Sequence, residues 1–282
     1  MKFAGVVTLY RPNEDVFDNI GSYLEELDIL YVLDNSENPL QEVREQMLVD
    51  KRIKYIAFHD NKGISYAMNY ALKHMKDYDF LLTMDQDSKF FPGMMKKYKE
   101  LVIKTETNNP GKIGVYSVNA GVDLTKMKAR QTGQDFYRVV DVAITSGSII
   151  SINASTSISG FDEKLFIDQV DIEFCYRMKK AGYQVVEFPT ILMHHTIGNI
   201  SYHHILSFRF STYNHNAIRK YYIVRNQIYV LKKYPEVRYI YIWSIIKQIM
   251  KVIVYEDNKL KKLKYIFKGG KDGIFNHMGK IS

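Results

Sequence analysis

Two aspartates one residue apart follow a short apolar run in the first third of the chain. Asp85 and Asp87 come directly after Phe80–Met84, whose length and composition predict a buried strand. Carboxylates at this spacing can hold a hard divalent cation through oxygen ligands, and such a cation can bridge the oxygens of a diphosphate. A polar turn before a helix uses the same residue types, so the pair alone is a weak indication of a metal site.

A second group of acidic residues lies at the start of a predicted helix, Val170–Ala181. Asp168, Asp171 and Glu173 crowd a position where the helix dipole and free backbone N–H groups stabilise carboxylates. They are therefore either ordinary helix caps or, at the edge of a crevice, candidates for a general base that activates a hydroxyl nucleophile.

Two adjacent histidines end a predicted strand further along the chain. His194 and His195 must point to opposite faces, so at most one of them can face a given crevice. A single histidine there could complete a cation shell or contact a phosphate. Together with His203 and His204, the pair lacks the carboxylate or cysteine spacing of a dedicated zinc site.

The elements that would position these groups alternate between strand and helix through residue 90. Apolar positions at helical spacing lie between Val16 and Leu27 and within Gly63–Met75. This alternation predicts a right-handed, mostly parallel sheet. The predicted strands are Phe3–Leu9, Ile29–Leu33, Ile53–Phe58 and Phe80–Met84.

Ligands of such sheets bind beyond the carboxyl ends of the strands, where the loops gather. Every loop that follows a predicted strand is polar, so we expect these loops to line one crevice. They are Thr8–Pro12, Asp34–Glu37, Asn61–Gly63 and Asp85–Ser88.

Beyond residue 90 the pattern is less regular. A helix is expected at Met94–Lys104, a strand at Ile113–Val118, and two strands within Arg138–Ile152. From Phe208 onward we expect helices, separated by Pro235 and by Gly269-Gly270. Two late strands are expected before them, at Val185–Phe188 and Ile191–His194. The predicted organisation is a catalytic domain of residues 1–205 and a basic, aromatic-rich helical region of residues 206–282.

Charge is distributed unevenly along the chain. The formal charge is +8, yet residues 200–282 carry 16 basic and 4 acidic residues, which leaves 23 basic and 27 acidic residues before them. No groove-reading motif accompanies the basic residues, so binding of nucleic acid is not expected. The ordinary content of 46% hydrophobic and 25% charged residues excludes a disordered chain.

Three features predict a cytoplasmic location. Cys175 is the single cysteine and cannot form an internal disulfide, which favours a reducing compartment. The N-terminal apolar run is interpreted as a strand and not as a signal peptide, because no small-residue cleavage site follows it. The longest uncharged stretch, Val142–Phe161, is too polar for a membrane-spanning helix.

The C-terminal region contains one unusually apolar predicted helix. Within Tyr239–Tyr255 the polar residues fall on a single stripe, so the remaining wide apolar face must be buried against the rest of the chain, a partner subunit or a membrane. The basic run Lys259–Lys264 is interpreted either as a solvated helix face or as a contact for anionic lipid headgroups. Homo-oligomerisation through these helices and peripheral binding to the inner face of the plasma membrane both stay open.

The ordered set of motifs resembles the family 2 glycosyltransferases, whose fold is GT-A, and within them the bacterial rhamnosyltransferases. The resemblance extends over roughly residues 1–230 and is far more specific than any single motif. It is carried by Val7-Thr8-Leu9-Tyr10, Asp34-Asn35-Ser36, Asn61–Asn69, Asp85-Gln86-Asp87, Thr145–Ser148, Val170–Glu173 through Arg177, His195–Gly198 and Tyr221–Asn226.

The resemblance implies an α/β GT-A fold with a C-terminal helical extension, and it implies roles for individual residues. Asp171 matches the general base of the Glu-Asp pair of the family, although Val170 replaces the glutamate. Asp85, Asp87 and His195 would hold Mg²⁺ or Mn²⁺. The donor nucleotide would contact Thr8, Tyr10, Asp34, Asn61, Gly63 and Asp85, and the sugar or acceptor pocket would include Ser146, Gly147, Asp168, Arg177 and Arg225.

The function implied is metal-dependent, inverting transfer of a sugar, with rhamnose from dTDP-rhamnose as the leading donor. The acceptor would be a hydroxyl of a growing bacterial surface glycan or of a glycoprotein glycan, linked to lipid or to protein. Two alternatives stay open, a UDP-galactose or UDP-glucose donor and a non-catalytic, oligomerising scaffold. A nucleotide-binding dehydrogenase is disfavoured because no glycine-rich turn follows the first strand.

Overall fold

The computed structural model describes residues 1–120, 137–195, 201–205, 208–212 and 215–281. Their contacts divide the chain into two compact units. The first unit comprises Met1–Asp162 and Val170–Thr196, and the second comprises Glu163–Gln169 and Ile197–Ser282. A catalytic domain that ends at residue 205 stays a prediction. His203 and His204 lie in the second unit, and their side chains are outside the described part.

The first unit is built on a nine-stranded sheet with the order β3-β2-β1-β4-β8-β6-β9-β5, and β7 pairs with β9. Strands β1 to β4 are parallel, as the sequence predicts, and the sheet is mixed beyond β4. The strands are β1 (Phe3–Leu9), β2 (Ile29–Asp34), β3 (Ile53–Ala57), β4 (Phe80–Asp85), β5 (Ser88–Phe90), β6 (Ile113–Ala120), β7 (Arg138–Val139), β8 (Ser148–Ser151) and β9 (Gln184–His195).

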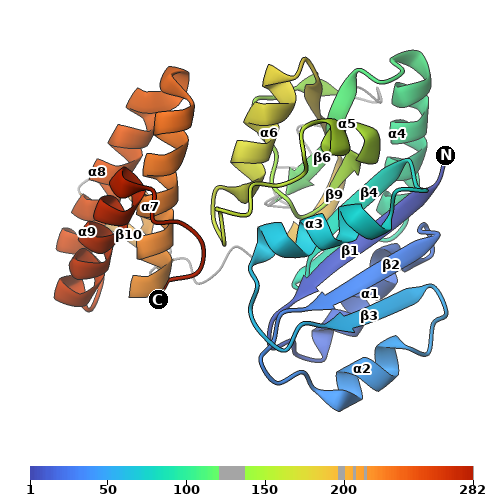
Figure 1. Cartoon of the computed structure of the whole chain (residues 1–282), viewed down its shortest axis with the longest axis horizontal. Coiled ribbons are helices and arrows are strands. Elements are labelled where there is room, and N and C mark those ends of the chain that lie inside the picture. The colour runs from blue at the N-terminus through green and yellow to red at the C-terminus, as the bar shows by residue number, and fades with distance from the viewer. Residues whose placement is uncertain (121–136, 196–200, 206–207, 213–214, 282) are drawn as a thin grey trace. The chain divides into compact units, whose positions relative to one another are not determined.

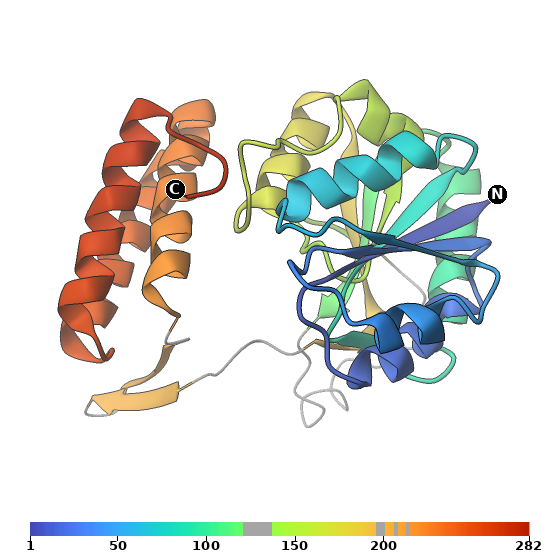
Figure 2. The same ribbon diagram turned by 60° about the horizontal axis from the view of Figure 1, so that its bottom comes forward.

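Helices cover both faces of this sheet (Figure 1). Helices α3, α5 and α6 lie over one face, and α1 and α4 lie over the other (Figure 2). Alternate β1 residues, Phe3, Val7 and Leu9, join the main hydrophobic core with α1 and α4, as the two-residue period of a strand requires. The helices are α1 (Asp15–Leu24), α2 (Gln41–Met47), α3 (Ile64–His74), α4 (Met94–Asn108), α5 (Ile152–Ser157) and α6 (Val170–Lys180).

The two late strands expected from the sequence are one strand, β9. In the pairing of β9 with β6, Phe188 lies opposite Val118, and Leu192 lies opposite the next β6 residue, Asn119. The chain of β9 therefore bulges around Pro189 and then continues in the sheet. Proline cannot donate a ladder hydrogen bond and is tolerated in strands at such irregularities. The prediction of a break was therefore wrong.

The second unit consists of a hairpin and three long helices (Figure 1). Strands β10 (Ser201–Ile205) and β11 (Phe208–Thr212) pair antiparallel, so the prediction of helices from Phe208 onward was wrong for its first residues. Within β11, Phe208-Arg209-Phe210-Ser211 alternate between aromatic and polar residues, which is the period of a strand. The helices are α7 (Ala217–Lys233), α8 (Arg238–Val254) and α9 (Lys259–Phe275), with the short 3₁₀ turn Pro235–Val237 before α8. Among the described residues, no helix has the length and apolar content needed to cross a membrane.

The glycine pair Gly269-Gly270 lies inside α9 and does not separate two helices. A Cβ at Gly269 would lie 2.4 Å from the backbone oxygen of Tyr221, and one at Gly273 would lie 2.8 Å from that of Arg225. The backbones of α7 and α9 therefore approach so closely that only glycine fits at the contact. Glycine allows two helices to pack closely here, although a glycine pair in a sequence is usually interpreted as a helix breaker.

This close contact predicts opposite effects of alanine at two neighbouring positions. We expect Gly269→Ala to lower the free energy of unfolding by about 1–3 kcal/mol, because the new methyl group overpacks the helix contact. Gly270→Ala should raise it by about 0.5–1 kcal/mol, because the nearest side-chain atom lies 3.9 Å away and alanine favours the helix. Urea unfolding of both variants measures this, and equal effects would contradict the packing role.

Candidate active site

Two aspartates and a histidine gather at the carboxyl end of β4. The side-chain ligand atoms of Asp85, Asp87 and His195 all lie within 4.8 Å of one another. β4 ends at Asp85, and β5 begins three residues later and pairs antiparallel with β9, in a register that sets Ser88 opposite His195. The short strand β5 therefore brings the histidine to the aspartate pair. Asp87 is 49% exposed and His195 is 19% exposed, so the cluster is open to solvent on one side.

Ser88 fixes the imidazole of His195. Its Oγ lies 2.8 Å from Nδ1 of His195, a hydrogen bond of the kind that orients metal-binding histidines. Ser88 is not among the predicted site residues, because its only signal in the sequence is its position after the aspartate pair. His194 lines a surface hollow of about 420 Å³ with Asp15, Asp18 and Asp87. Among the described residues, His195 is the histidine whose ring nitrogen lies with the two aspartates.

The donor set suits a hard or borderline divalent cation. Two carboxylates provide the oxygen ligands that Mg²⁺ and Mn²⁺ prefer, and Mn²⁺ also accepts an imidazole nitrogen. These residues would hold the cation where its charge can offset the negative charge of a diphosphate.

The loop Thr145–Ser148 holds the end of β4 from the other side. Ser146 Oγ accepts the backbone N–H of Asp85 at 3.1 Å, and the backbone N–H of Gly147 donates to the Thr83 oxygen at 2.9 Å. Gly147 has φ of 79°, and a Cβ there would lie 2.2 Å from the sulfur of Met193. Only glycine can therefore occupy this position. Ser146 and Gly147 thus position the backbone of Asp85.

Two of the predicted nucleotide-binding residues lie beside the cluster. Thr8 is opposite Asp85 in the register of β1 and β4, and its Oγ1 is buried with no hydrogen-bond partner among the described residues. The backbone N–H of Tyr10 donates to Gln86 Oε1 at 2.8 Å, and the amide of Gln86 donates back to the Tyr10 oxygen at 3.2 Å. The ends of β1 and β4 are thereby joined, and the Tyr10 ring stays partly exposed.

The other predicted nucleotide contacts end β2 and precede α3. Asp34 is buried and accepts hydrogen bonds from the Tyr55 hydroxyl at 2.5 Å and from the Ser36 backbone at 2.8 Å. Burial, followed by this bond to Asp34, raises the pKa of Tyr55. Asn61 accepts the backbone N–H of Gly63, whose φ of 87° favours glycine. Asp34 therefore shapes its loop, whereas Gly63 lets the backbone turn into α3.

Asp171 lies in the first turn of α6. Its Oδ1 accepts the backbone N–H of Ile172 at 2.9 Å. Asp171 lines a small apolar cavity together with Thr145 and Cys175. Burial raises the pKa of the Cys175 thiol to about 12, so the thiol stays protonated at neutral pH. The carboxylate of Asp171 is the group at this position that can accept a proton.

The sequence of this chain is similar to those of known glycosyltransferases. Residues 9–147 match the family described as Glycosyl transferase family 2. The chain is also 25% identical over 287 residues to "dTDP-rhamnosyl transferase RfbF" of Shigella flexneri, across 95% of this chain and 94% of that protein. Residues 9–147 thus form a family 2 glycosyltransferase domain. The resemblance predicted from the motifs, including the likeness to rhamnosyltransferases, is thereby confirmed.

Solved structures confirm the GT-A fold of the glycosyltransferase. GalNAc-T7, solved with UDP, GalNAc and Mn²⁺, matches with a TM-score of 0.63 and 10% identity over 98% of this chain and 56% of that one. S. aureus TarS matches with a TM-score of 0.54 and 13% identity over 99% and 44%. Residues 1–349 of TarS with UDP give a TM-score of 0.50 and 16% identity over 70% and 61%. The glycosyltransferase thus spans less than two thirds of each of these solved chains.

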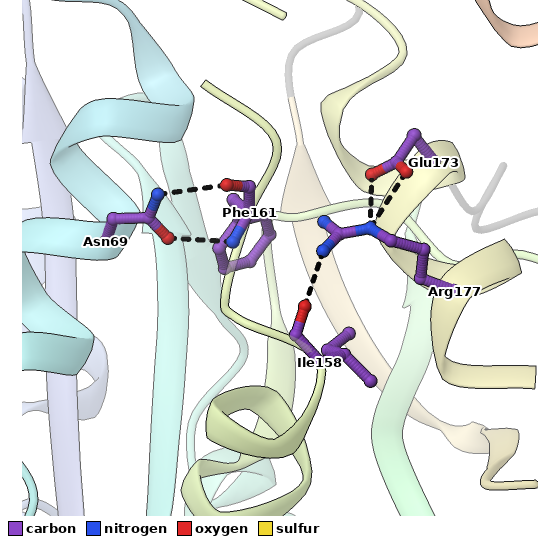
Figure 3. A network of polar contacts seen from close by, with 5 residues as sticks. All are labelled: Asn69, Ile158, Phe161, Glu173 and Arg177. Carbon is purple, nitrogen blue, oxygen red and sulfur yellow. Dashed lines mark hydrogen bonds and ion pairs between the residues drawn. The ribbon is translucent and has the colours of Figure 1, made fainter. Parts of the chain in front are cut away.

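Arg177 of the glycosyltransferase, predicted for the sugar or acceptor pocket, is engaged inside the first unit (Figure 3). Its Nε donates to both carboxylate oxygens of Glu173, at 2.8 and 2.9 Å, and Nη1 donates to the Ile158 oxygen at 2.7 Å. Nearby, the Asn69 amide exchanges two hydrogen bonds with the backbone of Phe161. These contacts fix the chain that leads toward α6, and a role for Arg177 in the pocket stays a prediction.

Asp168 and Arg225, the remaining predicted pocket residues, both belong to the second unit. Asp168 Oδ1 accepts from Arg219 at 3.2 Å, and burial raises the Asp168 pKa against the opposing influence of Arg219. The buried Arg225 guanidinium donates to the Gly279 oxygen at 2.7 Å and lies over the rings of Tyr221 and Tyr222. The structure therefore does not bring these two residues to the metal cluster within one unit.

The cluster predicts binding of a metal ion in the absence of nucleotide. We expect the full chain to bind Mn²⁺, with affinity lost in Asp87→Asn and reduced about 10-fold or more in Ser88→Ala, which releases the imidazole of His195. Electron paramagnetic resonance of free Mn²⁺ measures the binding. Glu42→Gln, which removes an exposed acid of α2, is the control, and a loss of affinity in that variant equal to the loss in Asp87→Asn would contradict the assignment.

Proposed function

We propose that this glycosyltransferase transfers rhamnose from dTDP-rhamnose to a hydroxyl of a bacterial surface glycan or of a glycan carried by a protein. The similarity to the Shigella flexneri protein named as a dTDP-rhamnosyl transferase carries the proposal, because it extends over 95% of this chain and 94% of that one. The open cluster of Asp85, Asp87 and His195 supports a donor that carries a diphosphate.

In the proposed reaction Asp171 is the general base. It takes the proton of the acceptor hydroxyl, whose oxygen then attacks the anomeric carbon as the nucleoside diphosphate leaves from the opposite side. This single displacement inverts the anomeric configuration. A divalent cation at the cluster would supply charge that stabilises the departing diphosphate more in the transition state than in the bound donor. Thr8, Tyr10, Asn61 and Gly63 are proposed to contact the nucleotide.

A UDP-sugar donor is the second candidate, and a specific observation favours it. GalNAc-T7 and TarS residues 1–349, which share the fold, were both solved with UDP. A methyl group in place of a hydroxymethyl group on the donor sugar is worth only about 1–3 kcal/mol of discrimination, so related pockets can differ in donor.

A donor panel separates these candidates. With Mn²⁺ present, dTDP-rhamnose should raise the melting temperature of the protein, because a ligand that binds the native state stabilises it, whereas UDP-galactose and UDP-glucose should not. The opposite pattern would replace the rhamnosyl proposal with the second candidate. Donor binding without transfer to any glycan acceptor would favour the scaffold alternative.

The base assignment predicts a selective loss in Asp171→Asn. Transfer should fall by about 10²–10⁴-fold, because the amide cannot accept the hydroxyl proton, while fold and donor affinity are retained. Release of nucleoside diphosphate in the presence of acceptor measures turnover, and the donor-induced melting shift checks binding. Near-normal turnover would contradict the assignment.

A further inference from the structure

Helix α8 directs two of its polar side chains, Ser244 and Gln248, toward the rest of its own unit. Ser244 Oγ accepts the Gln227 amide at 2.9 Å, and Gln248 Oε1 accepts the ammonium group of Lys220, also at 2.9 Å. Val252 is buried on the same side of the helix and packs in a small apolar cluster with α7 and α9. The side of α8 that carries Ser244, Gln248 and Val252 is therefore the face that contacts the rest of its own unit.

A buried ion cluster fixes this orientation. Glu256, two residues after α8, accepts hydrogen bonds from Lys220 at 2.6 Å and Lys262 at 2.9 Å, and all three side chains are buried. Burial alone would raise the pKa of Glu256, but the two lysines lower it. Removing one partner from such a cluster leaves a buried charge uncompensated. The helix therefore cannot turn its apolar face inward without breaking these contacts.

The opposite face of α8 exposes large apolar side chains. Tyr239 is 84% exposed, Trp243 58% and Met250 53%. Successive members of the stripe lie three or four residues apart, which puts them on one side of the helix. A contiguous apolar stripe of this kind on a surface marks a site of interaction. The stripe consists of Tyr239, Trp243, Ile246, Met250 and Ile253, flanked by Ile242 and Val254.

Lys247 of α8 borders this apolar stripe, and α9 carries further exposed lysines. Lys247 follows Trp243 by one helical turn, and its ammonium group lies 5.5 Å from the centre of the Trp243 ring. On α9, exposed Leu260, Phe267 and Ile274 share a face with Lys264 and Lys271. Tryptophan and tyrosine favour the boundary between lipid and water, and lysine favours anionic headgroups. A second copy of this basic surface would instead bring like charges together.

We propose that the stripe of α8 lies flat on an anionic membrane surface, with its apolar side chains in the headgroup region and the neighbouring lysines on the lipid phosphates. The helix satisfies the requirements of an interfacial helix, a wide apolar face bordered by basic residues. Binding through this surface would hold the enzyme beside acceptors in the membrane, whichever donor sugar the enzyme uses.

Trp243 is the single tryptophan of the chain, so its fluorescence reports directly on this face. We expect its emission to shift to shorter wavelength, and the protein to sediment, with vesicles of three parts phosphatidylcholine to one part phosphatidylglycerol. Pure phosphatidylcholine vesicles should bind far less, and binding should weaken as salt increases. The double variant Ile246→Ser, Met250→Ser should lose binding, whereas Val49→Ser, an exposed apolar position of the first unit, should not.

Three results would overturn the proposal. One is the absence of both sedimentation and an emission shift with the anionic vesicles. Another is emission already at short wavelength without lipid, together with a dimer mass by light scattering, which would assign the face to a second copy. The third is equal binding by the double variant and the wild type when both melt at the same temperature.

Discussion

The site depends on one buried strand, β4, and on how its end is held. β1 pairs with it in parallel and β8 pairs with it antiparallel, so the positions of both neighbours are fixed by its backbone. The buried Thr83 hydroxyl adds contacts to the oxygens of Thr145 and Ser148. Each such hydrogen bond contributes about 1 kcal/mol, and leaving a buried group unpaired costs more. The same strand therefore positions Asp85 and the loop beside Asp171.

The metal cluster and the candidate base are thus connected through one loop. Ser146 contacts the backbone of Asp85, and Thr145 shares a small cavity with Asp171. A displacement of this loop would change the separation between the position of the diphosphate and that of the acceptor hydroxyl. The backbone at Gly147 packs so closely against Met193 that even a Cβ atom would collide with it, so the loop has no room to move toward β9. Rigidity of this kind is what a displacement reaction requires of its scaffold.

The elements that can be predicted from the sequence are those with a strong local pattern of apolar and polar residues. The strands β1 to β4 have apolar runs that end in polar loops, so their existence follows from the sequence, and the crevice at their carboxyl ends stays a prediction. The glycosyltransferase motifs named Asp85, Asp87 and His195, and the structure brings the three together.

Features that depend on long-range pairing could not be predicted. β5 has three residues, too few to show a period, yet its register sets Ser88 against His195. The Gly269 contact depends on the distance between α7 and α9, which no local pattern encodes. Likewise, the buried partners of Glu256 lie on separate helices, and they decide which face of α8 points inward.

The central claim is that the aspartate–histidine cluster carries a metal ion that binds the diphosphate of the donor. Binding of metal and nucleotide must then be reciprocal, because each ligand raises the affinity for the other by the same factor. Calorimetric titration of dTDP into the protein, with and without saturating Mn²⁺, measures this coupling. The affinity should rise about 10-fold or more with Mn²⁺ in the wild type and stay unchanged in Asp87→Asn. Equal affinity of the wild type with and without the metal would contradict the account.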